Sequence, residues 1–226
     1  MRNIGAIVLA AGGSTRLGQP KQLLVIDGET LVRRVVNAVR AAGCAPIAVV
    51  VGAVRDRIAA ELRGTAAEIV ENDEWQRGLG TSIKCGLAHL LHSQPDLAAV
   101  LLLVSDQPFA DATLIRALID EHERSGKAIV ASSYEPRPLV MSTEVETSLK
   151  ETSERDSSAS VGMTKGGGVP ALFDRGCFEA LLGLPDDSGA KRVIEADLTR
   201  VAWVAFPEGA IDIDTPADLE RWRNAQ

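Results

Sequence analysis

The sequence predicts an α/β fold, in which helices cover both faces of one mostly parallel sheet in a single three-layer domain over residues 1–226. Three observations favour this fold. Short β-branched runs alternate with longer stretches of helical period, the pattern of strands joined by crossover helices. Residues 98–104 are apolar throughout, as expected of a strand buried on both faces. A glycine-rich turn follows the first strand-like segment, and the chain is long enough for a well-buried core.

Each expected element rests on its hydrophobic pattern. Thr30 is a candidate cap for the first helix, which should end before Gly43. Strands are expected at 4–9, 47–51, 68–71, 98–104, 128–131, 201–205 and 210–213. Helices are expected at 30–42, 81–91, 111–124, 174–182 and 216–223.

Composition excludes several functional classes. The formal net charge of −7 argues against a nucleic-acid surface, so any anionic ligand must be held by local groups. The first apolar run, 4–11, is too short for the core of a signal peptide, and no run reaches membrane-spanning length. Cys44, Cys85 and Cys177 are few and far apart, so neither a disulfide framework nor a zinc site is expected. The composition therefore favours a cytoplasmic protein without a nucleic-acid or membrane partner.

One segment interrupts the alternating pattern. Residues 142–168 are rich in Ser, Thr and Glu and lack aromatic residues, so they bury too little apolar surface to offset the entropy of ordering. We expect an insertion at about 135–167, either a dispensable disordered segment or a lid that orders on substrate binding. The run Gly166, Gly167, Gly168 is a candidate hinge under either interpretation.

The turn after the first strand reads LAAGGSTRLGQPKQLL, residues 9–24. Glycines let the backbone approach a ligand closely, and N–H groups beside Arg16 and Lys21 favour a phosphate. Two common phosphate motifs are excluded: the Gly-Lys pair of a P-loop is missing, and Pro20 comes soon after Gly18, where a dinucleotide fingerprint would open into a helix. Taken alone, the loop is equally compatible with a tight turn whose basic side chains are solvated.

The full spacing resembles the signature L-A-A-G-x-S-x-R-x-G-x-x-K of nucleotidyltransferases with a Rossmann-like fold, which cleave a nucleoside triphosphate between its α and β phosphates. Within them the chain is most similar to the molybdenum cofactor cytidylyltransferases and their accessory-protein relatives. The resemblance covers the chain except for about 135–165. Further matching segments, in the expected order, are NDEWQRGLGTSIKCGL, VSDQPF, GVPALF, DDSGAKRVI and DIDTPADLERW.

The chemistry of such a transfer suits these residue types. Attack of one phosphate on the α-phosphorus of a triphosphate brings two anions together, so cations and in-line positioning are needed rather than a covalent nucleophile. Arg16 grips oxygens with a planar fork, whereas Lys21 is a point charge that follows charge onto the leaving pyrophosphate. Mg²⁺ prefers a few carboxylates with phosphate oxygens and water, and Asp106 follows an expected strand directly. Because ligands bind beyond the carboxyl ends of parallel strands, Asp106 and the Gly12 loop should share one edge.

The resemblance implies further roles. Asp214 is the implied second metal ligand, and alternation along an extended segment puts Asp212 on the same face. Asn72 and Trp75 lie in a matching segment, but a Trp there is more often packing than a base platform. The implied catalytic residues are Arg16 and Lys21, and the implied metal ligands are Asp106 and Asp214. The implied nucleotide-binding residues are Leu9, Ala10, Ala11, Gly12, Gly13, Ser14, Gly80, Thr81, Ser82 and Asp106. The implied acceptor-binding residues are Gly168, Pro170, Asp187, Gly189 and Lys191.

Plainer interpretations stand beside these. Asp106 alone suits a turn residue, Asp214 the cap of a last helix, and Lys191 an ordinary exposed lysine. Many relatives have His or Asn where Val169 stands and Arg where Lys191 stands, which leaves the acceptor open. Two other sites are rejected. No carboxylate completes a metal site on the helical face of Cys85, His89 and His92, and the sequence around Ser14 is not G-x-S-x-G.

We therefore expect a Mg²⁺-dependent enzyme that transfers CMP from CTP to molybdopterin and releases pyrophosphate. One alternative of the same fold uses GTP, or acts on a sugar or alcohol phosphate. An alternative of another class is a non-catalytic chaperone that delivers the pterin cofactor to a molybdenum hydroxylase client. The presence of Arg16, Lys21, Asp106 and Asp214 together favours the enzyme, because a carrier has no need of two metal carboxylates.

Overall fold

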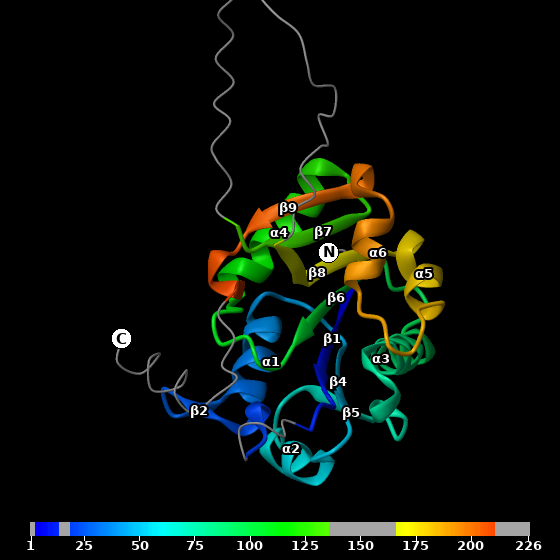
Figure 1. Ribbon diagram of the computed structural model, residues 1–226. Coiled ribbons are helices and arrows are strands. Elements are labelled where there is room, and N and C mark those ends of the chain that lie inside the picture. The colour runs from blue at the N-terminus through cyan, green and yellow to red at the C-terminus, as the bar shows by residue number, and fades with distance from the viewer. Residues whose placement is uncertain (1–2, 14–18, 136–165, 211–226) are drawn as a thin grey trace, which may run out of the picture.

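A seven-stranded sheet forms the centre of the protein, with strand order β5-β4-β1-β6-β8-β7-β9 (Figure 1). The structure is a computed structural model that describes residues 3–13, 19–135 and 166–210. The pairs β1–β4, β1–β6, β4–β5 and β7–β9 are parallel, whereas β8 is antiparallel to both of its neighbours. The prediction of a mostly parallel sheet is confirmed. The strands are β1 (Ile4–Ala10), β4 (Ile47–Val51), β5 (Ala67–Glu71), β6 (Ala99–Val104), β7 (Ile129–Ser133), β8 (Gly167–Asp174) and β9 (Val201–Ala205).

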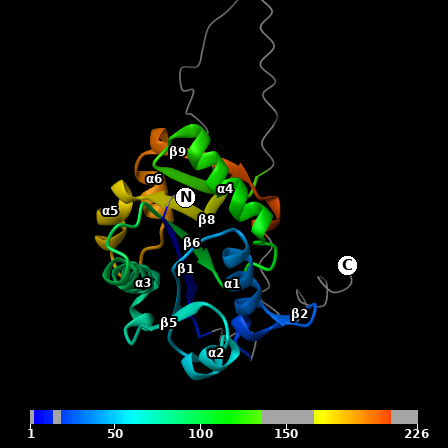
Figure 2. The same ribbon diagram turned by 180° about the vertical axis from the view of Figure 1, so that it is seen from behind.

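Helices cover both faces of this sheet, as Figures 1 and 2 show from opposite sides. The longer helices are α1 (Leu31–Ala41), α3 (Leu79–Ser93) and α4 (Ala112–Ser125). One apolar core contains residues of α1, α2 and α4, and a second contains residues of α3, α5 and α6, so the three-layer prediction is confirmed. The shorter helices are α2 (Arg55–Glu61), α5 (Phe178–Leu182) and α6 (Lys191–Ala196), and a small hairpin joins β2 (Val25–Ile26) to β3 (Glu29–Thr30).

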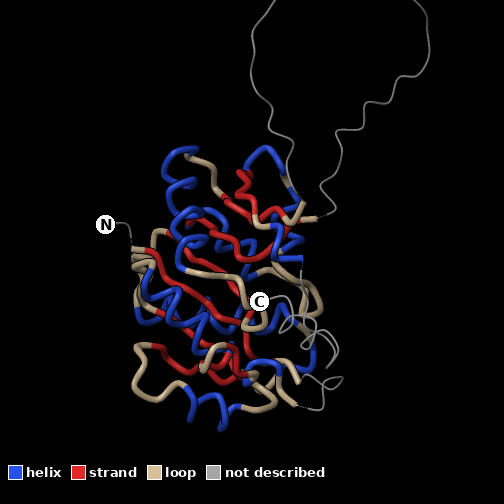
Figure 3. The backbone as a smooth tube through the Cα atoms, turned by 90° about the vertical axis from the view of Figure 1, so that its left-hand side faces the viewer, coloured by secondary structure: helices blue, strands red, loops and turns tan. Residues whose placement is uncertain are grey.

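The central strand β1 shows why a buried parallel strand has a continuous apolar sequence. All of its residues are buried, because α-helical layers cover both of its faces. Val8 belongs to the core under α1 and α4, and the adjacent Ile7 belongs to the core under α3. In register, Val8 lies beside Val49 of β4 and Leu103 of β6, so one apolar layer crosses the sheet. The tube in Figure 3 shows the strands enclosed between the helices.

Strand β8 corrects the prediction of a hinge. Gly167 and Gly168 pair with Ser133 and Ser132 of β7, so these two glycines are part of the sheet. The pairing register shifts at Ser132, and the Ser132 hydroxyl donates to the Pro170 carbonyl at 2.7 Å. Pro170 lacks an N–H, and this irregularity is the kind of place where a sheet tolerates proline.

Smaller differences concern element ends. The helix expected at 174–182 begins only at Phe178, because Asp174 ends β8 and the 3-10 turn Arg175–Cys177 follows. Thr30 precedes α1 but makes no capping bond, since its hydroxyl donates to Glu61 of α2 at 3.0 Å. Ala210 ends the 3-10 turn Pro207–Ala210 instead of opening a strand, and the rest of the elements expected at 210–213 and 216–223 lies outside the described residues. Within the described part of the chain, no helix is long and apolar enough to cross a membrane.

Candidate active site

A cavity of about 430 Å³ opens at the carboxyl ends of β1 and β6. Parallel strands present their ligand-binding loops at this edge of an open sheet. The backbone bond from Ser105 N to Leu9 O, 3.1 Å, holds the two strand ends together. The cavity is lined by Leu9, Ala11, Gly12, Lys21, Gln22, Trp75, Gln76, Gly78, Leu79, Ser82, Val104, Ser105 and Asp106. The structure thus brings Ser82 and Asp106 to the segment that contains both Gly12 and Lys21, although these three parts of the chain are far apart in the sequence.

Lys21 and Asp106 both line this cavity and form an ion pair. Lys21 Nζ lies 3.9 Å from Asp106 Oδ2, and the Asp106 side chain is 39% exposed. Mg²⁺ binds proteins through one or two carboxylates and completes its octahedron with substrate phosphates and water. Asp106 is an accessible carboxylate at a strand end, so it fits the ligands that Mg²⁺ prefers, and Lys21 beside it can neutralise phosphate. The expected second ligand Asp214, its neighbour Asp212, and Ser14 and Arg16 of the loop lie outside the described residues.

Gln22 anchors the start of the glycine loop at Gly12. The 3-10 turn Lys21–Leu23 turns this side chain inward, where it is only 4% exposed. Its Nε2 donates to Gly12 O at 2.8 Å and to Ala10 O at 3.2 Å, so one amide holds both the end of β1 and the loop. Sequence reasoning missed this residue. The available signal was a polar side chain between Lys21 and the apolar Leu23.

Replacing Gln22 by Leu should therefore destabilise the protein. The substitution removes the donor from the buried carbonyl of Ala10 and from the carbonyl of Gly12, which costs about 1–3 kcal/mol in the free energy of unfolding. Urea denaturation measures this loss, and the Michaelis constant for the nucleotide should rise with it. The exposed Gln19, changed to Leu, is the control and should shift stability by less than about 0.5 kcal/mol. Equal stabilities of the two variants would contradict the role of Gln22.

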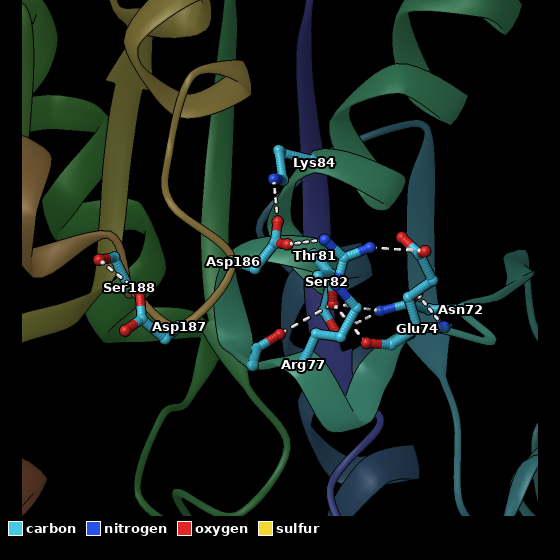
Figure 4. A network of polar contacts seen from close by, with 10 residues as sticks. Asn72, Glu74, Arg77, Thr81, Ser82, Lys84, Asp186, Asp187 and Ser188 are labelled. Atoms are coloured by element: carbon cyan, nitrogen blue, oxygen red, sulfur yellow. Dashed lines mark hydrogen bonds and ion pairs between the residues drawn. The ribbon is translucent and has the colours of Figure 1, made fainter.

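Asn72 organises the first turn of α3. Its Nδ2 donates to Thr81 Oγ1 at 2.9 Å and to Ser82 Oγ at 3.0 Å, while its Oδ1 accepts from Glu74 N (Figure 4). Thr81 Oγ1 in turn donates to Gly78 O at 2.8 Å. Ser82 lines the cavity, but the described lining includes neither Gly80 nor Thr81. Of Gly80, Thr81 and Ser82, which were expected to bind the nucleotide, Ser82 alone is therefore a lining residue of this cavity.

Trp75 packs against two glycines at the edge of the same cavity. A Cβ at Gly52 would lie 2.6 Å from Trp75 Cγ and 2.8 Å from Ala11 O, and one at Gly13 would lie 3.3 Å from the indole. The indole also lines a neighbouring hollow of about 510 Å³ at the ends of β4 and β5. Its contacts support the packing interpretation, in which Trp75 forms the wall between the two cavities.

A third cavity, of about 280 Å³, adjoins the first. The two share Leu9, Leu79 and Val104 as lining residues. The remaining residues of the third cavity are Leu102, Tyr134, Gly167, Gly168, Val169, Gly189, Ala190 and Lys191. Of the expected acceptor-binding residues, Gly168, Gly189 and Lys191 therefore meet here, whereas Pro170 and Asp187 lie outside the lining.

A buried polar side chain, that of Gln107, contacts two residues that line this third cavity. Gln107 Nε2 donates to Val169 O at 3.1 Å and to the Tyr134 hydroxyl at 3.3 Å, and that hydroxyl donates to the same carbonyl. Gln107 Oε1 is buried without a hydrogen-bond partner among the described residues. Sequence reasoning missed both Gln107 and Tyr134. The Gln-Pro turn after Asp106 was the signal for Gln107, but nothing local to Tyr134 indicated its contact.

The cysteines show no sign of nucleophilic chemistry. Burial raises the pKa of the Cys44 and Cys177 thiols to about 11, so both remain protonated at neutral pH. Cys85 donates to Glu71 O, and its neighbour on the helix face, His89, pairs with Glu68 at 2.6 Å. Among the described residues, no group of three or more His, Cys, Asp or Glu side chains is arranged to hold a metal ion.

Comparison with known proteins gives one family. A family model described as "MobA-like NTP transferase domain" matches residues 6–201. Bifunctional protein GlmU of Bifidobacterium animalis subsp. lactis (strain AD011) is 38% identical over 125 residues, covering 54% of this chain and 27% of that protein. Nicotine blue oxidoreductase of Paenarthrobacter nicotinovorans is 29% identical over 167 residues, covering 70% of this chain and 80% of that protein. The chain thus spans only about a quarter of the length of the first of these relatives.

A solved structure agrees with the family match. Rv0371c from Mycobacterium tuberculosis H37Rv superposes with a TM-score of 0.70 at 26% sequence identity, covering 97% of this chain and 96% of that one. A nucleotidyl transferase from Methanothermobacter (Mth528) also has a TM-score of 0.70, at 22% identity, and shows the same fold. The predicted Rossmann-like architecture is confirmed by these neighbours.

Proposed function

Because the chain belongs to the MobA-like NTP transferase family, we propose that it is a Mg²⁺-dependent nucleotidyltransferase that transfers CMP from CTP to molybdopterin. The observation that carries the proposal is the meeting of the Gly12 loop, Lys21 and Asp106 around one cavity at the carboxyl ends of β1 and β6. A triphosphate needs backbone N–H groups, a cation and a metal carboxylate within reach of one another. The Gly12 loop and Lys21, from one segment, and Asp106, from another, would supply these groups.

In the proposed reaction, a phosphate oxygen of the acceptor attacks the α-phosphorus of CTP. The new phosphorus–oxygen bond forms as the bond to the β-phosphate oxygen breaks, and pyrophosphate leaves with the charge. Lys21 neutralises the phosphates, and the proposed Arg16 adds a second cation. Gln22 holds Gly12 in place through its carbonyl, which would limit rearrangement of the backbone there during the reaction. Asp106 and the proposed Asp214 would hold Mg²⁺, which neutralises triphosphate oxygens when bound.

The two adjoining cavities suggest where the substrates bind. The nucleoside would lie against Leu9, the Gly12 loop and Ser82 in the first cavity. The acceptor would lie in the third cavity, whose apolar walls suit a ring system, with Lys191 near its phosphate. Lys191 Nζ is 3.6 Å from Glu195 on the same helix, an exposed pairing that a phosphate can displace. The shared residues Leu9, Leu79 and Val104 would then lie between the two substrates.

A screen of the four nucleoside triphosphates tests the proposed donor. We expect pyrophosphate release with CTP and molybdopterin to exceed release with GTP. The second Ala of the LAAG loop, Ala11, resembles the cytidylyl branch of the family, whereas the guanylyl branch usually has a second Gly at this position. Reactions without molybdopterin are the control and should show only background release. Equal or greater turnover with GTP would contradict the assignment of the base.

The same screen distinguishes the proposed cytoplasmic enzyme from a non-catalytic carrier. A chaperone would bind molybdopterin and deliver it to a molybdenum hydroxylase client without releasing pyrophosphate. Binding of molybdopterin with no turnover of any triphosphate would favour the carrier. Turnover that requires a sugar or alcohol phosphate would show that this compound, and not molybdopterin, is the acceptor.

A further inference from the structure

Asp186 joins two segments that are far apart in the sequence. It lies in the loop between α5 and α6, and its carboxylate forms ion pairs with Lys84 of α3 and with Arg77 just before α3 (Figure 4). Its backbone carbonyl accepts a hydrogen bond from Gly80 N at 2.8 Å. Arg77 also pairs with Glu74 at 2.7 Å. We call the contacts of Asp186 with Arg77, Gly80 and Lys84 the Asp186 junction.

The fit of the two backbones at this junction is close. A Cβ at Gly80 would overlap Pro185 O, and a Cβ at Gly78 would overlap Asp186 O. Gly78 also has a φ of +131°, a conformation that favours glycine. The loop at 185–188 therefore lies directly on the first turn of α3 because the sequence provides glycine at both positions.

The junction connects the walls of two cavities. Residues after Gly80 include Ser82, which lines the proposed nucleotide cavity, and residues after Asp186 include Gly189 and Lys191, which line the proposed acceptor cavity. Leu79 lines both, and a Cβ at Gly189 would lie 3.2 Å from Leu79 Cδ2. A shift of the loop against α3 would therefore move one substrate relative to the other.

We propose that Asp186 is a positioning residue that fixes the acceptor-binding segment against the nucleotide-binding segment. This proposal rests on the proposed function. Attack on the α-phosphorus requires the reacting atoms to be held in line at about 3–3.5 Å, and a displacement of about 1 Å costs about a hundredfold in rate. The four residues of the junction line neither of the two cavities, so the junction would act on alignment through the segments that it joins.

The charges at the junction suit this role better than a role in stability. The Asp186 side chain is 28% exposed and that of Arg77 is 58% exposed, and ion pairs in contact with water contribute little to folding. The hydrogen bond from Lys84 lowers the pKa of Asp186, with Arg77 adding to the effect. The carboxylate is thus ionised at neutral pH, and its contribution is lost only as acid titrates it through that lowered pKa.

Asp186→Asn tests the proposal, because it removes the charge and keeps the shape and the backbone bond to Gly80. We expect kcat for pyrophosphate release to fall by about tenfold or more, while the Michaelis constant for CTP changes less than about twofold. The melting temperature should change little. Combining it with Lys84→Met should lower kcat no further than the worse single variant, since both remove one interaction. Asp186→Glu should restore part of the rate.

Glu61→Gln is the matched control. Glu61 is 30% exposed and pairs with Arg33 at 2.9 Å, but it lies on α2, away from both cavities. The Glu61→Gln substitution should leave kcat unchanged. An unchanged kcat in Asp186→Asn, or a loss matched by Glu61→Gln or explained by a lower melting temperature, would overturn the proposal.

A second readout separates this proposal from the proposed function. If the unaltered protein turns over no triphosphate with any acceptor tested, the proposed function fails. Hydrogen exchange then tests, independently of activity, whether Asp186 holds the loop in place. Faster exchange of backbone amides at 184–191 in Asp186→Asn, but not in Glu61→Gln, supports a positioning contact, and unchanged exchange overturns it.

Discussion

Replacing Asp106 by Asn should lower kcat by about a thousandfold and leave the melting temperature nearly unchanged. A charged metal ligand contributes several kcal/mol to the transition state, which corresponds to a loss of this size. Folding should not depend on the charge, because the side chain is 39% exposed and its pairing with Lys21 is long, at 3.9 Å. Steady-state rates against Mg²⁺ concentration measure the effect, and excess Mg²⁺ or Mn²⁺ should rescue part of it.

Three other aspartates sharpen this experiment. Asp214→Asn should be as damaging as Asp106→Asn, and Asp212→Asn should be far milder, since its expected task is only to orient neighbours. Asp111→Asn is the matched control, because Asp111 caps α4 through Leu114 N at 2.8 Å and asparagine caps equally well. If Asp212→Asn were the most damaging variant, the wrong carboxylate would have been assigned. Retention of more than a tenth of the rate in Asp106→Asn would remove Asp106 from the metal site.

The strands were predictable because burial on both faces gives a strand a continuous apolar sequence. Strands such as β4 and β6 are apolar from end to end, so their limits could be predicted to within about a residue. Parallel strands then put Asp106 and the Gly12 loop at the same edge without further information.

Strand β8 was not predictable in this way. It begins with Gly167 and Gly168 and contains Pro170, residues that weaken a local tendency to form a strand. Its place in the sheet depends on pairing with β6 and β7, which lie far away in the sequence. Tertiary contacts therefore override the local pattern, and a glycine run that indicates a hinge in isolation becomes part of an antiparallel strand.

The side-chain contacts of the candidate site could not be predicted from the sequence either. Lys84 and Asp186 pair across more than a hundred residues, and the sequence identified the DDSGAK segment only by resemblance. Asn72 was noticed, but its bonds to Thr81 and Ser82 could not be derived from spacing. Gly80 was expected to bind the nucleotide, whereas its N–H is donated to Asp186 O. Local reasoning locates a site, but the partners of each polar group depend on the tertiary structure.

Gly80→Ala should be strongly disruptive, although alanine is the better helix former. Within a helix, alanine is favoured over glycine by about 1 kcal/mol. At this position the added methyl group would overlap Pro185 O and lie 3.0 Å from both Asp186 O and Ser188 O, and these are backbone atoms that cannot turn aside. The loop must therefore shift, and we expect the free energy of unfolding to fall by about 1–3 kcal/mol. Pyrophosphate release should fall by more than about tenfold, because Gly189 and Lys191 move with the loop.

Gly12→Ala is the stability control for this experiment. A Cβ at Gly12 meets nothing within 4 Å, so the substitution adds a methyl group without a clash, and urea denaturation should give nearly unchanged stability. The contrast between the two variants isolates the contact with the loop from the general effect of replacing glycine. If Gly80→Ala were as stable as the unaltered protein, or more stable by the helix preference of alanine, the loop would not lie against α3. The Asp186 junction would then lose its geometric basis as well, since the bond from Gly80 N to Asp186 O depends on the same close approach.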